Sequence, residues 1–593
     1  MQQLPIDTAS LEGRALRRDV VVAVALALLL SAAWAAGDWA RLGALILPDA
    51  DDMVRLVQIR DWIAGQAFAD WTQYRMAPPM GVPMHWSRIN DLVPAAIILA
   101  LRPFVGQGGA ELAAVLAYPA ALFSLHLFFA ARIARHLWSA GAGPVAAVLA
   151  ALAAPGITIF APGRIDHHAL QTVLVEAAVL ALTRRPDTRN GMLAGLCFAT
   201  SLVIGLETVP QLAALAAVPF ASWVVRGGRE RARLAGFGAA LGGATLAALL
   251  LLRPNYWNPA LCDAFTPASA AAALGGAAAL LALAAATPRL GDPRARLLAA
   301  VPLGAAVLGA VLWAYPACLA GPYGALHPFL RENFLPHIIE ARGVFAGTSP
   351  ARAVELAGLV AAGSLASVWM AARRPRRWPV TAPVAGVVLA SALVMLVQVR
   401  GVYLGAPLAA PVLAGLVLAA RRRASWRAPA LLATWLVSAG AAYALPRQLL
   451  ATGGDRPELA AEGSAAGADC AAADIWRDVD RYPRGVVMAG ASLAPFLLAS
   501  THHAAVGASY HRNERGDLAM YRYFLSPPAQ AAAVARAWRV DYLAFCPGDF
   551  DELDVRRRYP DSVGAILAAG RDPPGLRRLP LRDSGLRFYR VER

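Results

Sequence analysis

The sequence contains no lysine, so all 55 of its basic residues are arginines. This absence excludes chemistry that needs a lysine amine, such as Schiff-base formation or phosphate binding by a P-loop lysine. Charged residues of any kind are also scarce, at 16% of 593 residues, whereas 58% are hydrophobic. This balance is typical of a chain with many bilayer-spanning segments and not of a globular domain.

The formal net charge is +16, yet no continuous basic stripe accompanies it. The arginines fall in short loops between apolar runs, which is the distribution expected next to membrane helices. Nucleic acid is therefore not an expected partner, because its recognition needs basic residues gathered on one face or helix.

The apolar runs predict about thirteen transmembrane helices. Arg14, Arg17 and Arg18 precede the first run and place the N-terminus in the cytoplasm, and later arginine clusters follow even-numbered spans, so the C-terminus lies outside. The predicted spans are 20–36, 111–135, 144–161, 168–183, 191–206, 209–225, 233–252, 269–286, 297–314, 353–371, 380–398, 402–420 and 428–445.

The segment 91–105 is interpreted as a re-entrant or interfacial helix. It is short, begins at Asp91 and contains Arg102 and Pro103. Counting it as a crossing would move Asp166 to the cytoplasmic side and reverse every later arginine cluster, which the charge distribution argues against.

Two domains follow from this topology: a membrane domain over 1–445, with long external loops at 37–110 and 315–352, and an external tail over 446–593. Residues 485–489 and 539–545 have strand-like patterns, so the tail is predicted to be a small soluble α/β domain. The five cysteines include Cys470 and Cys546 in the tail, and we predict that these two pair. Cys262 and Cys318 fall at external helix ends, where a disulfide is also permitted.

Two acidic clusters lie just outside predicted membrane helices: Asp49-Ala50-Asp51-Asp52 and Arg164-Ile165-Asp166-His167-His168. Carboxylates and imidazoles are costly near lipid and usually persist there because they bind something, so the two clusters predict a divalent-metal site. His337-Ile338-Ile339-Glu340 and Arg400-Gly401-Val402-Tyr403 map to the same side of the membrane. Alone, each has an ordinary explanation: a helix N-cap, a loop acid, or an arginine that reaches the lipid headgroups.

In order and topology, the four motifs resemble the catalytic subunit of oligosaccharyltransferases, especially the single-subunit archaeal and bacterial enzymes of the GT-C class. The resemblance covers roughly residues 15–445. Asp51 matches the first-loop catalytic aspartate, because Arg60 stands nine positions later as in the family pattern, and Asp52 is its neighbouring competitor.

The later motifs continue the resemblance. Asp166 and His168 match an Asp-x-His metal motif in which His167 is a spacer. Glu340 matches the end of a Thr-Ile-x-Glu motif, although His337 replaces the threonine, and Arg400 matches an arginine that contacts the donor's phosphates.

The resemblance implies an α-helical polytopic membrane protein that moves a sugar or oligosaccharide from a polyprenyl-phosphate or pyrophosphate donor to an acceptor. Asp51, Asp166 and Glu340 are then the catalytic residues, and with His168 they hold Mn²⁺ or Mg²⁺. Arg400 and Tyr403 bind the donor phosphate. Further possible substrate contacts are Asp52, Arg60, Trp86, Arg88, His167, Glu207 and His337.

Two features leave the substrate open. The aromatic and arginine residues of 66–90 suit sugar or phosphate contacts, but equally an interfacial anchor. The Trp-Trp-Asp-Tyr-Gly motif with which oligosaccharyltransferases recognise a protein acceptor is absent from 446–593, which offers Thr501-His502-His503 and Tyr510-His511-Arg512-Asn513-Glu514 instead. Two interpretations of these runs stay open: they recognise the acceptor, or they form an ordinary surface loop.

The acceptor is therefore a protein, a lipid or a glycan, and the expected location is a bacterial inner membrane with the site on the periplasmic face. Two other functions stay open on the sequence alone: a transporter or flippase of lipid-linked glycans, and a structural membrane protein.

Overall fold

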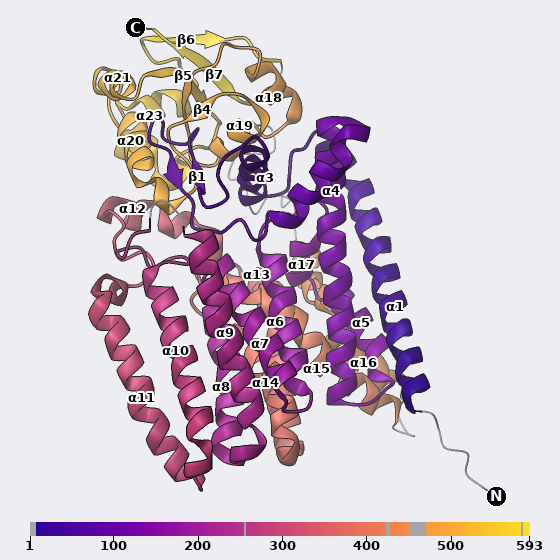
Figure 1. The fold of residues 1–593 in the computed structure, drawn as a ribbon. Helices are drawn as coiled ribbons and strands as arrows, with labels where there is room; N and C mark the ends of the chain where they lie inside the picture. The colour runs from indigo at the N-terminus through magenta and orange to yellow at the C-terminus, as the bar shows by residue number, and fades with distance from the viewer. Residues whose placement is uncertain (1–7, 254–256, 423–426, 451–469, 583–584, 593) are drawn as a thin grey trace, which may run out of the picture.

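Long apolar helices make up most of the chain, and a mixed α/β domain caps one end of their bundle (Figure 1). The computed structural model describes residues 8–253, 257–422, 427–450, 470–582 and 585–592. The end of the bundle that carries the C-terminal domain is called the domain end below. The N-terminal end of α1 lies at the opposite end (Figure 1).

The helices of the bundle are α1 (Thr8–Gly37), α4 (Leu92–Leu137), α5 (Ala142–Ala151), α6 (His168–Thr183), α7 (Thr188–Ile204), α8 (Val209–Arg226), α9 (Arg231–Leu252), α10 (Pro267–Ala286), α11 (Pro293–Ala314), α13 (Pro350–Arg373), α14 (Trp378–Met395), α15 (Val402–Arg421), α16 (Arg427–Ser438) and α17 (Leu445–Leu450). Shorter helices in the connecting segments are α2 (Trp39–Gly43), α3 (Ala50–Ile63) and α12 (Pro328–Asn333).

The predicted count of about thirteen spans is not confirmed. Among the described residues, nine helices are long and apolar enough to cross a membrane, or ten if a pair bent by 77° between 428 and 449 counts as one span. Each predicted segment does contain a helix, but α5 has only 10 residues and α6 only 16. The apolar composition continues through the breaks, so the sequence pattern overstates helix length.

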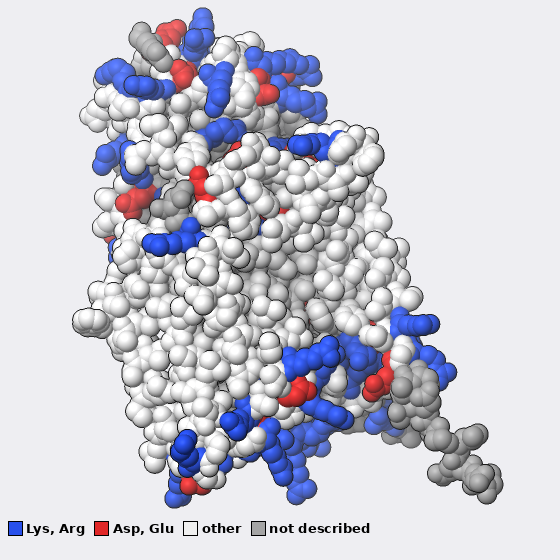
Figure 2. Space-filling model, viewed as in Figure 1, with Lys and Arg blue, Asp and Glu red and all other residues white. Residues whose placement is uncertain are grey.

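On the face shown in Figure 2, a broad band without charged side chains covers the middle of the bundle, and arginines gather at its two ends. This band is what a bilayer core requires, because charges there are strongly unfavourable. At the opposite end, the buried carboxylate of Asp19 on α1 binds Arg135 on α4 at 2.6 Å. The chain is thus a multi-pass membrane protein.

The break at Gly106 separates residues 92–105 from the rest of α4. Gly106 has φ 73° and ψ 174°, outside the helical region. Apolar side chains on the first part, such as Phe104 and Val93, are largely exposed. Its interfacial placement stays a prediction.

Glycines allow a close backbone contact between α7 and α9. A Cβ atom at Gly191 would lie 2.2 Å from the Arg233 carbonyl oxygen, and one at Gly195 would lie 2.3 Å from that of Phe237. This Gly-x-x-x-Gly spacing lets two backbones touch where apolar burial alone gives little attraction between helices in lipid.

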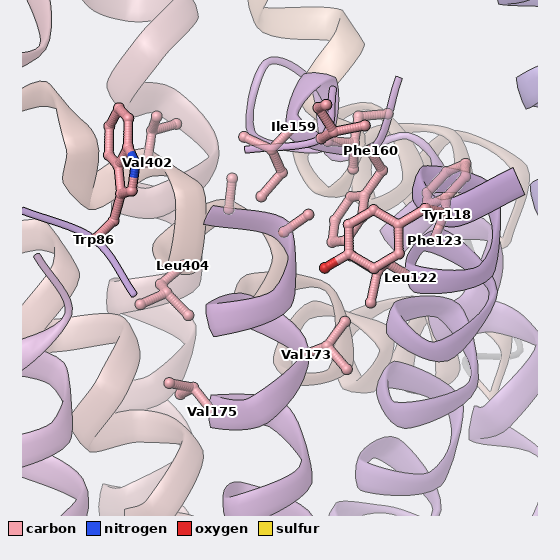
Figure 3. Packing of buried hydrophobic residues seen from close by; sticks show 14 of the residues in the cluster. Trp86, Tyr118, Leu122, Phe123, Ile159, Phe160, Val173, Val175, Val402 and Leu404 are labelled. Atoms are coloured by element: carbon pink, nitrogen blue, oxygen red, sulfur yellow. The ribbon is translucent and has the colours of Figure 1, made fainter. Parts of the chain in front are cut away.

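Aromatic residues fill the space between α4, α6 and the one-turn helix after α5. Phe123 and Phe160 stack there beside Tyr118 (Figure 3), with ring centroids of the two phenylalanines 5.5 Å apart. His126 stacks on both phenylalanines and binds Glu176 on α6 at 2.7 Å, and both side chains are fully buried. This packing sets the lateral position of α6, whose N-terminus carries the Asp166-His167-His168 cluster.

The C-terminal domain contains a five-stranded mixed sheet in the order β4-β3-β5-β7-β6. Its strands are β3 (Val486–Ala489), β4 (Ala504–Ala505), β5 (Val540–Phe545), β6 (Leu576–Leu579) and β7 (Arg587–Val591). Its helices are α18 (Ala473–Val479), α19 (Ala494–Ser500), α20 (Glu514–Leu525), α21 (Pro528–Ala537), α22 (Val555–Arg558) and α23 (Val563–Ala568). Both predicted strands are confirmed as β3 and β5, which pair in parallel.

Two disulfides lie at the domain end. Cys470 pairs with Cys546, which confirms that prediction, and Cys262 pairs with Cys318. Cys197 is free and buried. The Cys262–Cys318 disulfide joins the loop after α9 to the segment after α11.

The C-terminal domain is fastened to the first long loop, which also contains a short hairpin of β1 (Thr72–Gln73) and β2 (Val82–Pro83). Arg75 donates to the carbonyls of Leu498 and Thr501, and Arg60 to that of Ala499. These carbonyls lie at the C-terminal end of α19, where unpaired oxygens and the helix dipole favour a cation. The two arginines therefore dock the domain.

Candidate active site

The first acidic cluster opens α3 at the domain end. Asp49 is the N-cap, and its carboxylate accepts from the backbone N–H of Asp51 at 2.9 Å. Asp51 and Asp52 follow in the first helical turn, where carboxylates are favoured by the helix dipole. Successive helical residues point about 100° apart, so the two side chains reach different surroundings.

Asp52 is fully buried and holds the second cluster in place. Its Oδ1 accepts from the backbone N–H groups of Ile165 and Asp166, each at 2.8 Å. Arg164 lies beside it, with Nε 3.4 Å from Asp52 Oδ2, and also donates to Asp49 at 2.8 Å. Asp52 thus fixes the backbone at 165–166 and so sets the position of Asp166.

Asp166, His167 and His168 form a compact ligand-type cluster at the start of α6. One donor atom from each lies within 4.8 Å of the others, and all three side chains are buried. His167 Nδ1 is 2.6 Å from Asp166 Oδ1, and His168 Nε2 is 3.4 Å from Asp166 Oδ2. His167, expected as a spacer, therefore belongs to the cluster.

Glu340 and Arg400 join the same cluster from later in the chain. His168 Nε2 is 4.0 Å from Glu340 Oε2. The two Glu340 oxygens accept from Arg400 Nε at 2.8 Å and from the Tyr403 hydroxyl at 2.7 Å. The Tyr403 ring lies 5.0 Å from the imidazole of His168.

Two further residues complete the inner face of the cluster. Glu207, predicted as a possible substrate contact, has its Oε2 3.5 Å from His167 Nε2. Arg55, which the sequence did not single out, is fully buried on α3 and contacts Asp166 at 3.4 Å and His167 at 3.1 Å. The sequence signal that could have identified Arg55 is its position four residues, about one helical turn, after Asp51 on α3.

The electrostatics of the cluster suit a bound cation. Burial and the neighbouring carboxylates of Asp166, Asp49 and Glu340 raise the pKa of Asp51 well above its usual range. Burial opposes the charged form of Asp166 too, but the imidazoles of His167 and His168 outweigh it and hold its pKa well below the usual range. Several acids that repel one another in a buried site are what a divalent ion would neutralise.

The donor set also fits the expected ion. Asp51, Asp166 and Glu340 offer hard oxygen ligands and His168 offers one nitrogen, a set that suits Mn²⁺ or Mg²⁺ better than a thiolate-preferring metal. No cysteine among the described residues lies in the cluster, since four are in disulfides and Cys197 is buried on α7.

Four predicted contact residues lie outside the cluster. Arg60 binds Glu111 and docks the C-terminal domain, and His337 is exposed and bonded to the Asn333 carbonyl. Arg88 is fully buried and donates to the Gln58 and Asp70 carbonyls.

The fourth, Trp86, is 1% exposed and lies under the Arg55 guanidinium at 4.5 Å. The loop 66–90 folds beneath the C-terminal domain, which turns its aromatic and basic side chains into packing and docking contacts. Trp86 still borders the cluster, with its ring 5.7 Å from that of His167.

The C-terminal domain contributes Tyr510 to the cluster. This side chain is 3% exposed and donates to the Ala50 carbonyl at 3.3 Å, one residue before Asp51. Burial and the nearby Asp51 carboxyl raise the pKa of Tyr510 well above its usual range. The sequence marked the polar run 510–514, but no pattern within it singles out Tyr510, because its contact with Ala50 joins positions far apart in the chain.

Solved structures of oligosaccharyltransferases share this fold. The oligosaccharyltransferase AglB of Archaeoglobus fulgidus, in complex with an inhibitory peptide and a dolichol-phosphate, matches 93% of this chain and 72% of its own with a TM-score of 0.66 at 14% identity. The same organism's enzyme tethered to an acceptor peptide with an NVT sequon matches 98% of this chain and 74% of its own, with a TM-score of 0.64 at 15% identity.

A third structure of the Archaeoglobus fulgidus oligosaccharyltransferase, a complex with Zn and sulfate, matches 90% of this chain and 68% of its own with a TM-score of 0.58 at 16% identity. No protein-family model and no curated protein matches the sequence. The likeness establishes the fold: a helical membrane bundle with a C-terminal domain, arranged as in these oligosaccharyltransferases, which is the GT-C-like fold that the resemblance in sequence implied.

Proposed function

We propose that this GT-C-fold protein is an integral-membrane glycosyltransferase that moves a sugar or oligosaccharide from a polyprenyl-phosphate or pyrophosphate donor to an acceptor. The observation that carries the proposal is the convergence of Asp51, Asp166, His168, Glu340 and Arg400, from four separate segments, on one partly buried cluster at the domain end. A structural protein has no need to gather mutually repelling acids in this way.

The residues divide the chemistry between them. Arg400 presents a guanidinium suited to a forked contact with the donor's phosphate, assisted by the Tyr403 hydroxyl. A divalent cation held by Asp51, Asp166, His168 and Glu340 would neutralise phosphate oxygens and so stabilise the departing group. Asp51 orients the acceptor and takes its proton while the acceptor atom bonds to the anomeric carbon and the bond from that carbon to the phosphate oxygen breaks.

Several finer points belong to the same proposal. The ion is Mn²⁺ or Mg²⁺, and His167 and Glu207 border the donor or acceptor site. The domain end faces the periplasm of a bacterial inner membrane in this proposal, which the arginines at the opposite end support (Figure 2). The Archaeoglobus fulgidus oligosaccharyltransferase has been solved with a dolichol-phosphate and with an acceptor peptide. A lipid-linked donor is therefore the proposed substrate class here, with a protein, lipid or glycan acceptor.

Metal binding gives the first test. We expect Mn²⁺ to raise the unfolding temperature of the purified wild type, because a ligand that binds only the folded state stabilises it by about 2.7 kcal/mol at 100 times its Kd. Asp166→Ala and Glu340→Ala should lose most of this increase. Asp38→Asn should keep it, because Asp38 is a 39% exposed acid of the first loop, paired with Arg41. An equal increase in all four proteins would exclude this metal site.

Substrate accumulation gives the second test. Cells that lack the protein should accumulate a lipid-linked glycan, because a transferase consumes it. Complementation with the wild type should restore the normal amount, and complementation with Asp166→Ala should not. An unchanged pool of lipid-linked glycans, measured by mass spectrometry of extracted lipids, would contradict the proposed function. No observation favours the flippase alternative.

A further inference from the structure

A second group of polar residues lies beside the site, where three segments distant in sequence meet. Asp263 follows the disulfide cysteine Cys262 and is 9% exposed. Its carboxylate accepts from His511 Nε2 at 2.5 Å and from Arg512 through Nε at 2.8 Å and an NH2 group at 2.7 Å. This is a forked arginine contact with a second, imidazole donor, the strong geometry for a charge pair.

The same segment is held on its other side by the first loop. Arg512 also donates to the Met84 carbonyl at 3.0 Å. The His511 ring lies 4.9 Å from that of His85 and 5.1 Å, edge-on, from that of Tyr323. His511 and Arg512 are therefore fixed between the first loop and the two segments that the Cys262–Cys318 disulfide joins.

The residue before His511 is Tyr510, whose side chain reaches the start of α3, where Asp51 lies. Its ring packs edge-on against Trp86 at 5.6 Å, and its hydroxyl donates to the Ala50 carbonyl, the residue before Asp51 at the start of α3. A change in the position of 511–512 must therefore move this hydroxyl, which lies near Asp51.

We infer that Asp263 is a positioning residue: anchored by the adjacent Cys262–Cys318 disulfide, it fixes His511 and Arg512 and so seats Tyr510 beside Asp51. The disulfide removes freedom from the loop that carries Asp263, so the carboxylate is in place before substrate arrives. The inference rests on the proposed function for its effect on rate, but the placement of 510–512 can be measured without any substrate.

The kinetic test compares Asp263→Ala with Glu111→Ala. Glu111 is the matched control, because it is a buried acid that holds another arginine, Arg60, at the same domain boundary but away from Tyr510. We expect Asp263→Ala to lower kcat about 10- to 100-fold with the KM for the donor unchanged, since misplacement of a reacting group by about 1 Å has an effect of this size. Asp263→Glu, which keeps the carboxylate, should recover part of the rate.

The structural test is hydrogen exchange of the purified proteins. Asp263→Ala and the double variant Cys262→Ser/Cys318→Ser should both speed amide exchange in 506–513, whereas Glu111→Ala should not. Should Asp263→Ala fail to fold, Asp263→Asn and the double cysteine variant carry the same comparison.

The outcomes are separable. Unchanged exchange in 506–513, or a loss of kcat that Glu111→Ala shares, overturns the positioning role. Absence of transfer by the wild type overturns the proposed function instead, and the exchange measurement then decides the positioning role on its own.

Discussion

Replacement of Asp51 by asparagine should abolish most transfer while leaving the protein at least as stable as the wild type in metal-free buffer. The carboxylate is placed to take the acceptor's proton, and loss of a positioned acid or base lowers rates by about 10²–10⁴-fold. Asparagine has a similar shape but cannot accept a proton, so the effect is chemical and not steric.

The stability part of this prediction has its own physical reason. The pKa of Asp51 is raised by burial and by Asp166, Asp49 and Glu340, so its charged form is disfavoured in the folded protein relative to the unfolded chain. A raised carboxyl pKa lowers folded stability as pH rises above the unfolded value, so at neutral pH the neutral asparagine relieves this repulsion. Thermal unfolding in EDTA and a transfer assay would measure both effects, with Asp38→Asn as control. A variant that is both active and less stable would refute the assignment.

Replacement of Asp52 by alanine should, unlike Asp51→Asn, lower the stability of the folded protein as its main effect. Asp52→Ala removes the acceptor of two buried backbone N–H groups, those of Ile165 and Asp166, and each unsatisfied group costs about 1–3 kcal/mol. Because the same bonds present Asp166, we also expect transfer to fall by about 10²-fold, the effect of a small misplacement of a reacting group.

Asp52→Asn separates the two contributions of this side chain. The asparagine oxygen can still accept from both amides, so the stability measured by thermal unfolding should lie well above that of Asp52→Ala. What it loses is the charge beside Arg164. If the alanine and asparagine variants unfold at the same temperature, the hydrogen bonds to Ile165 and Asp166 are not what Asp52 contributes.

That acids distant in the sequence lie together in one site could be predicted from the sequence, but only with the help of a resemblance. Asp166, His168 and Glu340 stand in motifs whose order and membrane side can be compared with a known family. Asp51 and Asp52 are adjacent identical residues, and their different environments follow from the helical geometry of α3 and its packing on 164–166, which no local pattern encodes.

Other parts of the site depend on tertiary packing in the same way. Arg60 and Arg88 look like phosphate ligands in a loop of aromatics, yet Arg60 docks α19 and Arg88 supports the backbone of its own loop. The strands β3 and β5 were predictable because buried strands have a short alternating or apolar pattern. The number of spans was not, because the composition stays apolar past the ends of α5 and α16.

The contact between Tyr510 and the start of α3, where Asp51 lies, has a consequence for biosynthesis. Tyr510 follows the last helix of the bundle, so a ribosome has made the whole bundle before the hydroxyl can meet its partner. A nascent chain whose helices have all been inserted still lacks this contact. Completion of the proposed site therefore waits for a domain that is made after the bundle, and a product truncated after α17 would have every helix of the bundle but an incomplete site.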